Sequence, residues 1–142
     1  VLGDRRGITV VDDYAHHPTE VTAVLEAARQ AYPGRRLVAV FQPHLYSRTR
    51  DFADGFARAL LGADIVVVLP LYAAREGPMN GVDEGLVVEA AARLGHGAVS
   101  SGPAVDDASG FVDTLLASGD VLITLGAGDV HRVAEDWLRG AA

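Results

Sequence analysis

Short apolar runs alternate with segments of helical periodicity along the whole chain, and this alternation constrains the fold more than any other feature of the sequence. The apolar runs predict strands over residues 8–11, 37–41, 65–69 and 121–125, with a weaker strand over 98–100. The helical spacing predicts a helix that begins at Pro18 and further helices over residues 52–61, 86–94, 111–116 and 130–138. Strands that alternate with helices in this way indicate an α/β domain with a mostly parallel sheet.

The length of 142 residues predicts a single domain. Residues 1–7 look like a severed strand and a turn that lead into Ile8, so we expect one antiparallel hairpin strand there, in a module taken from a longer chain. The chain has no cysteine, which excludes a disulfide scaffold, a thiolate zinc site and a cysteine nucleophile. The apolar runs fall far below the roughly 18 residues that a membrane span needs, and no signal peptide opens the chain. We therefore expect a cytoplasmic protein without a membrane partner.

Basic residues are few and of one kind, because all 12 are arginine and the chain contains no lysine. The formal net charge is −7, and the excess of acidic side chains lies in residues 59–142. This acidic character argues against a nucleic acid partner. The absence of lysine excludes the phosphate-binding lysine of a P-loop and a Schiff-base lysine. If the domain works on a nucleotide, another domain must supply that cation.

Polar residues that directly follow the apolar runs are the best candidates for function, because ligands of an open parallel sheet bind beyond the carboxyl ends of its strands. In chain order they are Asp12, Asp13, Tyr14, His16 and His17; then Gln42, His44, Tyr46, Ser47 and Arg48; then Tyr72, Arg75 and Glu76; and finally Thr124, Gly126, Gly128 and Asp129. We expect these four groups to share one rim of the sheet.

Residues 12–18 (DDYAHHP) allow two interpretations. They form a ligand-facing turn, or their Asp and His side chains merely cap the helix that begins at Pro18. Two aspartates and two histidines this close could also ligate a divalent cation. Adjacent histidines tend to point apart, however, and no further pair is spaced to complete the shell, so we predict no metal site.

Residues 41–50 (FQPHLYSRTR) also allow two interpretations. The simpler one is a solvated helix start with Ser47 or Thr49 as the N-cap. The functional one is an anion site for a carboxylate or phosphate, made by the amides of the helix N-terminus together with Arg48 and Arg50.

The segment Gly126-Ala127-Gly128 follows a strand and precedes a helix, as a dinucleotide-binding loop does. The third glycine of that fingerprint is replaced by His131, which argues against a dinucleotide site. A glycine-rich turn whose backbone groups face a substrate is the remaining interpretation.

Four segments together carry a resemblance to a known family. DDYAHHPTE at 12–20, FQPHLYSRTR at 41–50, YAAREGP at 72–78 and LGAGDV at 125–130 make the chain similar to the C-terminal domain of the Mur ligases, in particular of the branch that joins L-alanine to UDP-N-acetylmuramate. The resemblance implies a Rossmann-like, three-layer domain with a sheet of about six strands, one of them antiparallel. Residues 1–142 would be the amino-acid-binding domain, and the UDP-binding and central ATPase domains would lie outside this chain.

The resemblance also implies a reaction in peptidoglycan synthesis. The carboxylate of UDP-N-acetylmuramate is phosphorylated by ATP, and the amino group of L-alanine attacks the resulting acyl phosphate. ATP and Mg²⁺ would be bound mainly by the central domain, with Asp13 contacting the ATP ribose. His16 would be the catalytic candidate, since an imidazole can influence the proton of the amine. The residues implied in amino acid binding are Tyr14, His16, His44, Arg48, Gly126, Ala127 and Gly128.

One departure from the family stands at Leu45, where many relatives have arginine directly after the motif histidine. The role of that arginine would pass to Arg48 or Arg50, or be lost. Three other functions remain open at this point. They are a ligase that recycles whole muropeptides, a non-catalytic regulatory module that binds an anionic metabolite through Arg48, and a metal phosphohydrolase built on Asp12, Asp13, His16 and His44.

Overall fold

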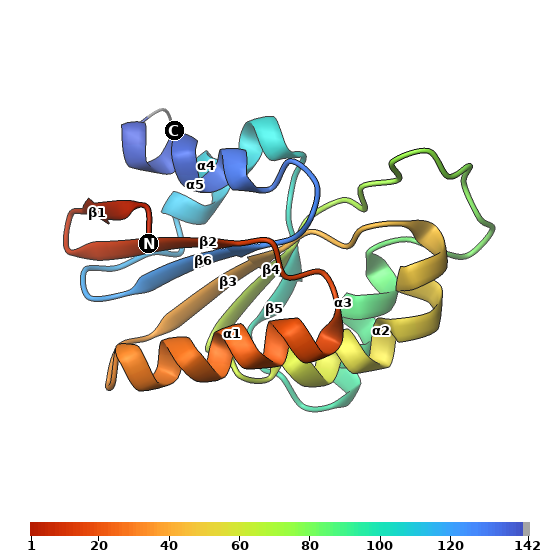
Figure 1. Cartoon of the computed structure of the whole chain (residues 1–142), viewed down its shortest axis with the longest axis horizontal. Helices are drawn as coiled ribbons and strands as arrows, with labels where there is room; N and C mark the ends of the chain where they lie inside the picture. Colours follow the sequence, from red (N-terminus) through yellow and green to blue (C-terminus); the bar gives the residue numbers. More distant parts are fainter. Residues whose placement is uncertain (141–142) are drawn as a thin grey trace.

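The computed structural model describes residues 1–140, which form a six-stranded sheet and five helices (Figure 1). The strands are β1 (Gly3–Arg5), β2 (Ile8–Asp13), β3 (Leu37–Phe41), β4 (Ile65–Val68), β5 (Val99–Ser101) and β6 (Val121–Leu125). The helices are α1 (Pro18–Ala31), α2 (Tyr46–Leu60), α3 (Gly85–Arg93), α4 (Val105–Asp113) and α5 (His131–Arg139).

The strand order across the sheet is β1-β2-β6-β3-β4-β5. Every neighbouring pair is parallel except β1 with β2, where Gly3 lies opposite Val10 in an antiparallel register. The last strand of the chain, β6, therefore lies between the first two strands that helices follow. This arrangement confirms the expected mostly parallel sheet with one antiparallel strand.

Helices cover both faces of the sheet (Figure 1): α1, α2 and α3 lie on one face, and α4 and α5 lie on the other. The central strand β3 shows why its sequence is apolar throughout. Leu37, Ala39 and Phe41 pack in the core on the α1 and α2 face, whereas Val38 and Val40 pack in the core under α4 and α5. A strand that is buried on both sides has no position for a solvated side chain.

Three elements differ from the sequence-based expectations by more than one residue at a boundary. Strand β2 continues through Asp12 and Asp13, because Asp12 pairs with Thr124 and its carboxylate accepts a hydrogen bond of 2.6 Å from the Thr124 hydroxyl. Helix α2 begins at Tyr46, before the apolar positions that predicted it, and contains a kink at Phe52. The third difference concerns α4.

Helix α4 spans Val105–Asp113, whereas the sequence predicted a helix over 111–116. The apolar positions that fix it are Val105, Ala108 and Val112, which are buried at helical spacing. Small and acidic residues between them weaken the pattern, although the two aspartates in the first turn suit a helix N-terminus. The prediction of its position was wrong for this reason.

A buried tryptophan connects β1, α4 and α5. Trp137 is completely buried, and its indole N–H donates to Asp113 at 3.0 Å. Arg6 forms an ion pair with the same carboxylate, and the Arg5 guanidinium lies 4.7 Å from the indole ring centroid. The pKa of Asp113 is held below its ordinary value, first by the bond from Trp137 and then by Arg6.

Within residues 1–140 no helix is long and apolar enough to cross a lipid bilayer.

We expect Trp137→Phe to lower the free energy of unfolding by about 1 kcal/mol, because one hydrogen bond to a carboxylate is lost while most of the apolar burial remains. Trp137→Ala should cost about 3–5 kcal/mol, since it also leaves a cavity. Urea unfolding of both variants measures the two effects. An unchanged free energy of unfolding in Trp137→Phe would show that the hydrogen bond from the indole N–H to Asp113 contributes nothing beyond packing.

Candidate functional site

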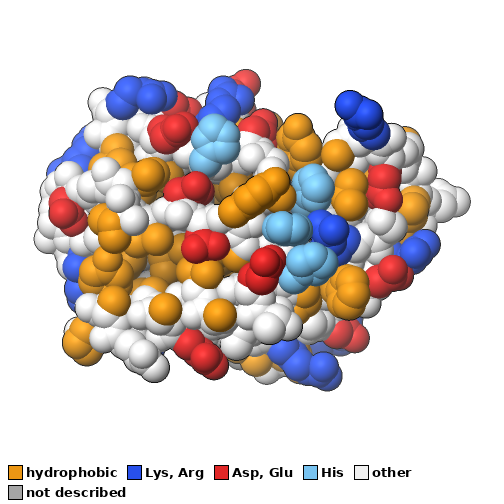
Figure 2. Space-filling view, in the orientation of Figure 1, with side chains coloured by type: hydrophobic (Ala, Val, Ile, Leu, Met, Phe, Trp, Pro, Cys, Tyr) orange, Lys and Arg blue, Asp and Glu red, His pale blue; other side chains and the backbone are white. Residues whose placement is uncertain are grey.

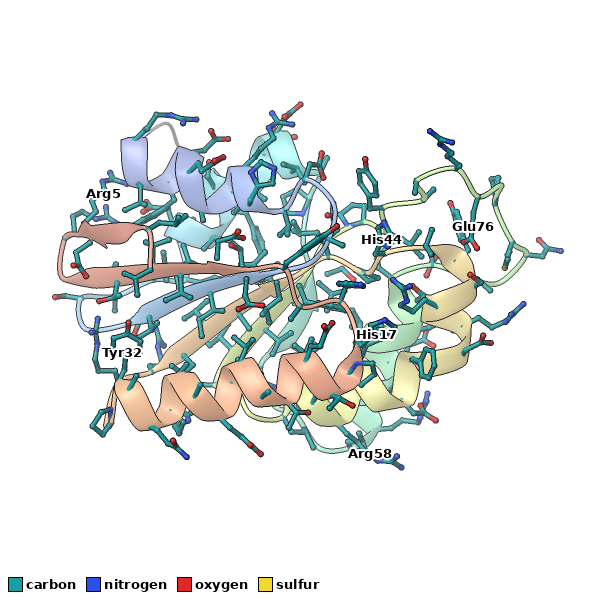
Figure 3. The ribbon with its side chains drawn as sticks, in the orientation of Figure 1. Arg5, His17, Tyr32, His44, Arg58 and Glu76 are labelled. Atoms are coloured by element: carbon teal, nitrogen blue, oxygen red, sulfur yellow. The ribbon has the colours of Figure 1, made fainter. Side chains whose placement is uncertain are left out.

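The polar loops that follow β2, β3 and β6 gather at one end of the sheet, as expected. Figure 2 shows histidine side chains gathered on this face, and Figure 3 shows His17 and His44 at the same end of the ribbon. The ring centroid of His16 lies 4.8 Å from that of His17, 5.2 Å from Tyr14 and 6.2 Å from His44. The structure therefore brings together residues from the first two predicted motifs.

His16 has one ring nitrogen committed to the backbone. Its Nδ1 lies 2.9 Å from the carbonyl oxygen of Tyr14, and 3.6 Å from a carboxylate oxygen of Glu20. Because a carbonyl oxygen can only accept, this contact assigns the proton of the neutral ring to Nδ1. The other nitrogen, Nε2, then carries a lone pair and is the basic atom of the side chain.

Two carboxylates fix the turn that carries His16. Asp13 accepts a hydrogen bond of 2.9 Å from the amide of Ala15, and Glu20 accepts from the amides of His16 and His17 at 3.1 and 3.0 Å. These bonds, first of all the one from the His16 amide, lower the pKa of Glu20. Glu20 thus caps the start of α1, where His17 is the N-cap residue, and Asp13 fixes the turn before it. These bonds involve the backbone of His16 and not its ring, whose centroid lies 6.2 Å from that of His44.

His44 has the opposite arrangement of ring nitrogens. Its Nδ1 lies 3.2 Å from Nη1 of Arg48, and because a guanidinium only donates, Nδ1 must be the acceptor. The neutral ring of His44 therefore carries its proton on Nε2. Burial lowers the pKa of His44, and the positive charge of Arg48 lowers it further. His16 thus supplies a basic nitrogen to the rim, while His44 supplies an N–H donor.

The turn between His44 and α2 depends on an unusual backbone conformation at Leu45. This residue has φ 71° and ψ 136°, a region that side chains other than glycine rarely adopt, at a cost of about 1–3 kcal/mol. The conformation is held from both sides, since the Leu45 amide donates to Tyr72 at 2.8 Å and its carbonyl accepts from the amide and hydroxyl of Thr49. Thr49 therefore lies inside the helix, and its predicted role as N-cap was wrong.

The N-terminus of α2 is capped by a residue from a distant loop. Glu76 accepts hydrogen bonds from both the amide and the hydroxyl of Ser47, which lower its pKa. Ser47 is thus a donor within the helix and not its N-cap. Because this carboxylate already accepts from the Ser47 amide, that amide is not free for an external anion in this structure.

The two arginines of that hypothesis have different surroundings. Arg50 is exposed and forms an ion pair of 2.9 Å with Asp51. Arg48 is half-buried and has no carboxylate partner within residues 1–140, so its charge is balanced only by solvent in this state. Arg48 is therefore the cation of the predicted pair that is placed to bind an anion.

The glycine-rich turn lies between the two histidine loops. The Gly126 amide donates to the Asp13 carbonyl at 3.2 Å, and the Gln42 side chain donates to Asp129 at 2.8 Å. A Cβ on Gly128 would lie 2.5 Å from Oε1 of Gln42 and 2.7 Å from the ring of Tyr72. Glycine is required there because the turn packs directly against these two side chains.

A continuous series of contacts links the loops around the end of the sheet. Gly128 packs on Tyr72, whose ring stacks on His44 at a centroid distance of 5.7 Å, and His44 in turn faces His16. On the other side, a cavity of about 280 Å³ is lined by residues of the first and last motifs and by His131, the first residue of α5. The motif residues are Asp12, Tyr14, Gly126, Ala127 and Gly128. All the residues predicted for amino acid binding therefore lie on one rim.

The sequence placed Gln42, Tyr72 and Glu76 among the polar residues of this rim but gave them no role. The sequence could have marked Gln42 as a structural residue of the site. A polar side chain directly after a wholly apolar strand is often buried, and a buried polar side chain needs a hydrogen-bond partner. Glu76 had no such signal, since its partner Ser47 lies 29 positions away. In the part of the chain that the structure describes, no three His, Asp or Glu side chains are grouped so that they could hold a metal ion.

The model of the family described as "Mur ligase, glutamate ligase domain" matches residues 1–128. The chain belongs to the Mur ligase family. It is 51% identical over 136 residues to the UDP-N-acetylmuramate–L-alanine ligase of Salinibacter ruber, and 52% identical over 136 residues to that of Kineococcus radiotolerans. Each match covers 96% of this chain but 29% of the relative, so the chain spans less than a third of the length of these Mur ligases.

Solved structures of this family have the same fold. The UDP-N-acetylmuramate-alanine ligase of Thermotoga maritima superposes with a TM-score of 0.75 at 24% identity, covering 99% of this chain and 28% of that one. A murein peptide ligase of Psychrobacter arcticus gives a TM-score of 0.78 at 25% identity, covering 98% and 28%. At 24% identity, the match with the Thermotoga ligase supports the fold of this domain and says nothing about its substrate.

We expect Glu76→Gln to lower the melting temperature at neutral pH, because the amide is a weaker acceptor for the Ser47 donors than the carboxylate. The pKa of Glu76 is lowered in the folded state, so its stabilisation is present at neutral pH and is lost as the pH falls through the folded-state value. Thermal melts of both proteins from pH 7 downward should therefore converge in acid. A constant difference across this range would contradict the proposed cap.

We expect Gly128→Ala to destabilise the domain by about 1–3 kcal/mol, since the added methyl would overlap Gln42 and Tyr72. Gly77→Ala is the matched control, because no atom lies within 4 Å of a Cβ at Gly77 and its φ is not in the left-handed region. Urea unfolding should show a loss for the first variant alone. Equal effects would mean that the close contact at Gly128 is relaxed in solution.

Proposed function

We propose that this chain is the amino-acid-binding domain of a ligase that joins L-alanine to UDP-N-acetylmuramate at the expense of ATP. The observation that carries the proposal is the arrangement of His16, His44 and Arg48 on one rim, beside the turn at Gly126–Gly128. The identity of about half the residues to ligases of that name supports the choice of substrate. The enzyme would act in the cytoplasm, where its substrates are made.

The rest of the active site would come from other domains of the same protein. This chain has no lysine and no P-loop, and its described residues show no grouped metal ligands, so its side chains do not fit a site for Mg²⁺ and the ATP phosphates. We place the site for Mg²⁺ and the ATP phosphates in a central ATPase domain, and the site for the UDP group in an N-terminal domain. Asp13, half-buried at the end of β2, would contact the ATP ribose when the domains close.

The reaction would proceed in two steps. A carboxylate oxygen of UDP-N-acetylmuramate attacks the γ-phosphorus of ATP, which forms an acyl phosphate and releases ADP. The neutral amine of L-alanine then attacks the acyl carbon, and the tetrahedral intermediate expels inorganic phosphate as the amide forms. The nitrogen must lose a proton during this step.

The side chains of this rim suit the second step. The basic Nε2 of His16 can accept the proton of the amine, and the exposed Tyr14 beside it can bound the space where the amine approaches. The guanidinium of Arg48 can bind the carboxylate of L-alanine, and the N–H of His44 can donate to the same group or to the leaving phosphate. Backbone groups of Gly126, Ala127 and Gly128 would close the remaining side.

The test is phosphate release by the full-length protein with ATP, Mg²⁺ and UDP-N-acetylmuramate, comparing L-alanine with glycine, L-serine and a muropeptide side chain. Release that depends on L-alanine is the expected result. Release with the peptide alone would assign a recycling ligase, the activity that the name of the Psychrobacter structure suggests. No release with any acceptor would leave a non-catalytic anion-binding module. The isolated domain should show no ATPase activity.

We expect Arg48→Ala in the full-length protein to weaken the use of L-alanine more than the binding of UDP-N-acetylmuramate, because only the amino acid would contact this side chain. His16→Ala should lower turnover by at least tenfold, which is about 1.4 kcal/mol in the barrier. Arg58→Ala is the control, since Arg58 is an exposed arginine in the last turn of α2, away from the rim (Figure 3). Equal effects of Arg48→Ala on both substrates would place Arg48 outside the amino acid site.

A further inference from the structure

A second cavity adjoins the candidate site, between the first turns of α4 and α5 and the segments that follow β3 and β4. It has a volume of about 280 Å³, and its polar lining comes from Gln42, Asp106, Asp129 and Arg132. None of these residues has a role in the proposed reaction. Two side chains are shared between the cavity and the candidate site: Gln42 and Tyr72 line the cavity and pack against Gly128, and Tyr72 also stacks on His44.

Tyr72 is wedged between two parts of the candidate site. Its ring is nearly parallel to that of His44, at an interplanar angle of 17°, and its Cγ lies 2.7 Å from the Cβ position of Gly128. Its backbone is bonded on both sides, since its amide donates to Pro43 and its carbonyl accepts from Leu45, each at 2.8 Å. The ring is thus held as a wall between the rim where the amine would approach and the second cavity.

Beyond this wall, the cavity is rich in hydrogen-bond acceptors. Gln42 is 3% exposed, and its Oε1 has no hydrogen-bond partner in the part of the chain that the structure describes. The amide orientation is fixed, because the Gln42 Nε2 donates to Asp129. Arg132 forms an ion pair with Asp106 and lies 3.8 Å from Asp129, so one positive charge faces two carboxylates and a buried amide oxygen. Such a surplus of acceptors favours an ammonium group.

We propose that Tyr72 sets the size limit of the amino acid substrate by closing off a latent side-chain pocket whose chemistry suits a cationic side chain. The proposal rests on the proposed function. With Tyr72 in place, its ring blocks a side chain longer than a methyl group from reaching the second cavity. With the ring removed, a side chain that ends in an amine reaches Gln42 and Asp129, and the ligase accepts L-2,4-diaminobutyrate or L-ornithine.

The test compares kcat/KM of the full-length ligase for L-alanine, L-2,4-diaminobutyrate and the apolar L-norvaline, measured by phosphate release. The wild-type protein should use L-alanine and discriminate strongly against both longer acceptors. Tyr72→Ala should raise kcat/KM for L-2,4-diaminobutyrate at least tenfold, the scale of discrimination that a small change in a side-chain pocket gives. Gln42→Met in the Tyr72→Ala background should remove this gain and leave the use of L-norvaline unchanged.

Two control variants and one substitute variant accompany Tyr72→Ala. Tyr72→Phe retains the wall and should give no gain, and Tyr32→Ala removes a half-buried tyrosine that caps the far end of α1, so it reports general loosening. If thermal melts show that Tyr72→Ala is unfolded, Tyr72→Leu opens part of the same space and is measured instead. A folded variant with unchanged preferences would overturn the proposal, and an equal gain for L-norvaline would overturn the cationic chemistry. A wild-type protein that ignores L-alanine would instead overturn the proposed function.

Discussion

The insertion of β6 between β2 and β3 is the constraint on which the candidate site depends. It pairs residues far apart in the chain, such as Asp12 and Thr124, which are separated by 112 positions. Because the three strands are parallel, their carboxyl ends coincide, and the loops that follow them must share one edge. Since the connecting helices leave these strands on opposite faces, the loops diverge and open a crevice between them. The candidate site is the direct result of this strand order.

Hydrogen bonds from the backbone hold the carboxylates of this edge in place. Asp13 and Glu20 accept from amides of the first loop, and Glu76 accepts from the first turn of α2. The bonds to Glu20 and Glu76 lower the pKa of these two carboxyl groups. Arg48 pairs with neither of them and neighbours a histidine instead. The two neighbouring imidazoles therefore have different neutral forms, one with a lone pair on Nε2 and one with an N–H at Nε2. Their difference comes from one carbonyl group and one guanidinium.

The sequence predicted most of the fold, because the strands are apolar on both faces and the helices have regular apolar spacing. It failed at α4, where small residues carry the core contacts, and at the start of α2, where the backbone of Leu45 decides the geometry. For the candidate site, the four motifs lie in loops that the fold brings to one edge of the sheet. They could not show that Glu76 reaches Ser47 or that Tyr72 lies between His44 and Gly128, since these contacts depend on how separate loops pack.

The packing of Gly128 against Gln42 and Tyr72 also has a consequence for how this domain can evolve. Three residues from three different loops share one small volume, so a change at any one of them alters what the others tolerate. A larger residue at position 128 becomes acceptable only after the side chains at both 42 and 72 have changed to make room, and the reverse order passes through an unstable intermediate. The accessible mutational paths at this edge are therefore ordered, and homologues should show correlated substitutions at these three positions.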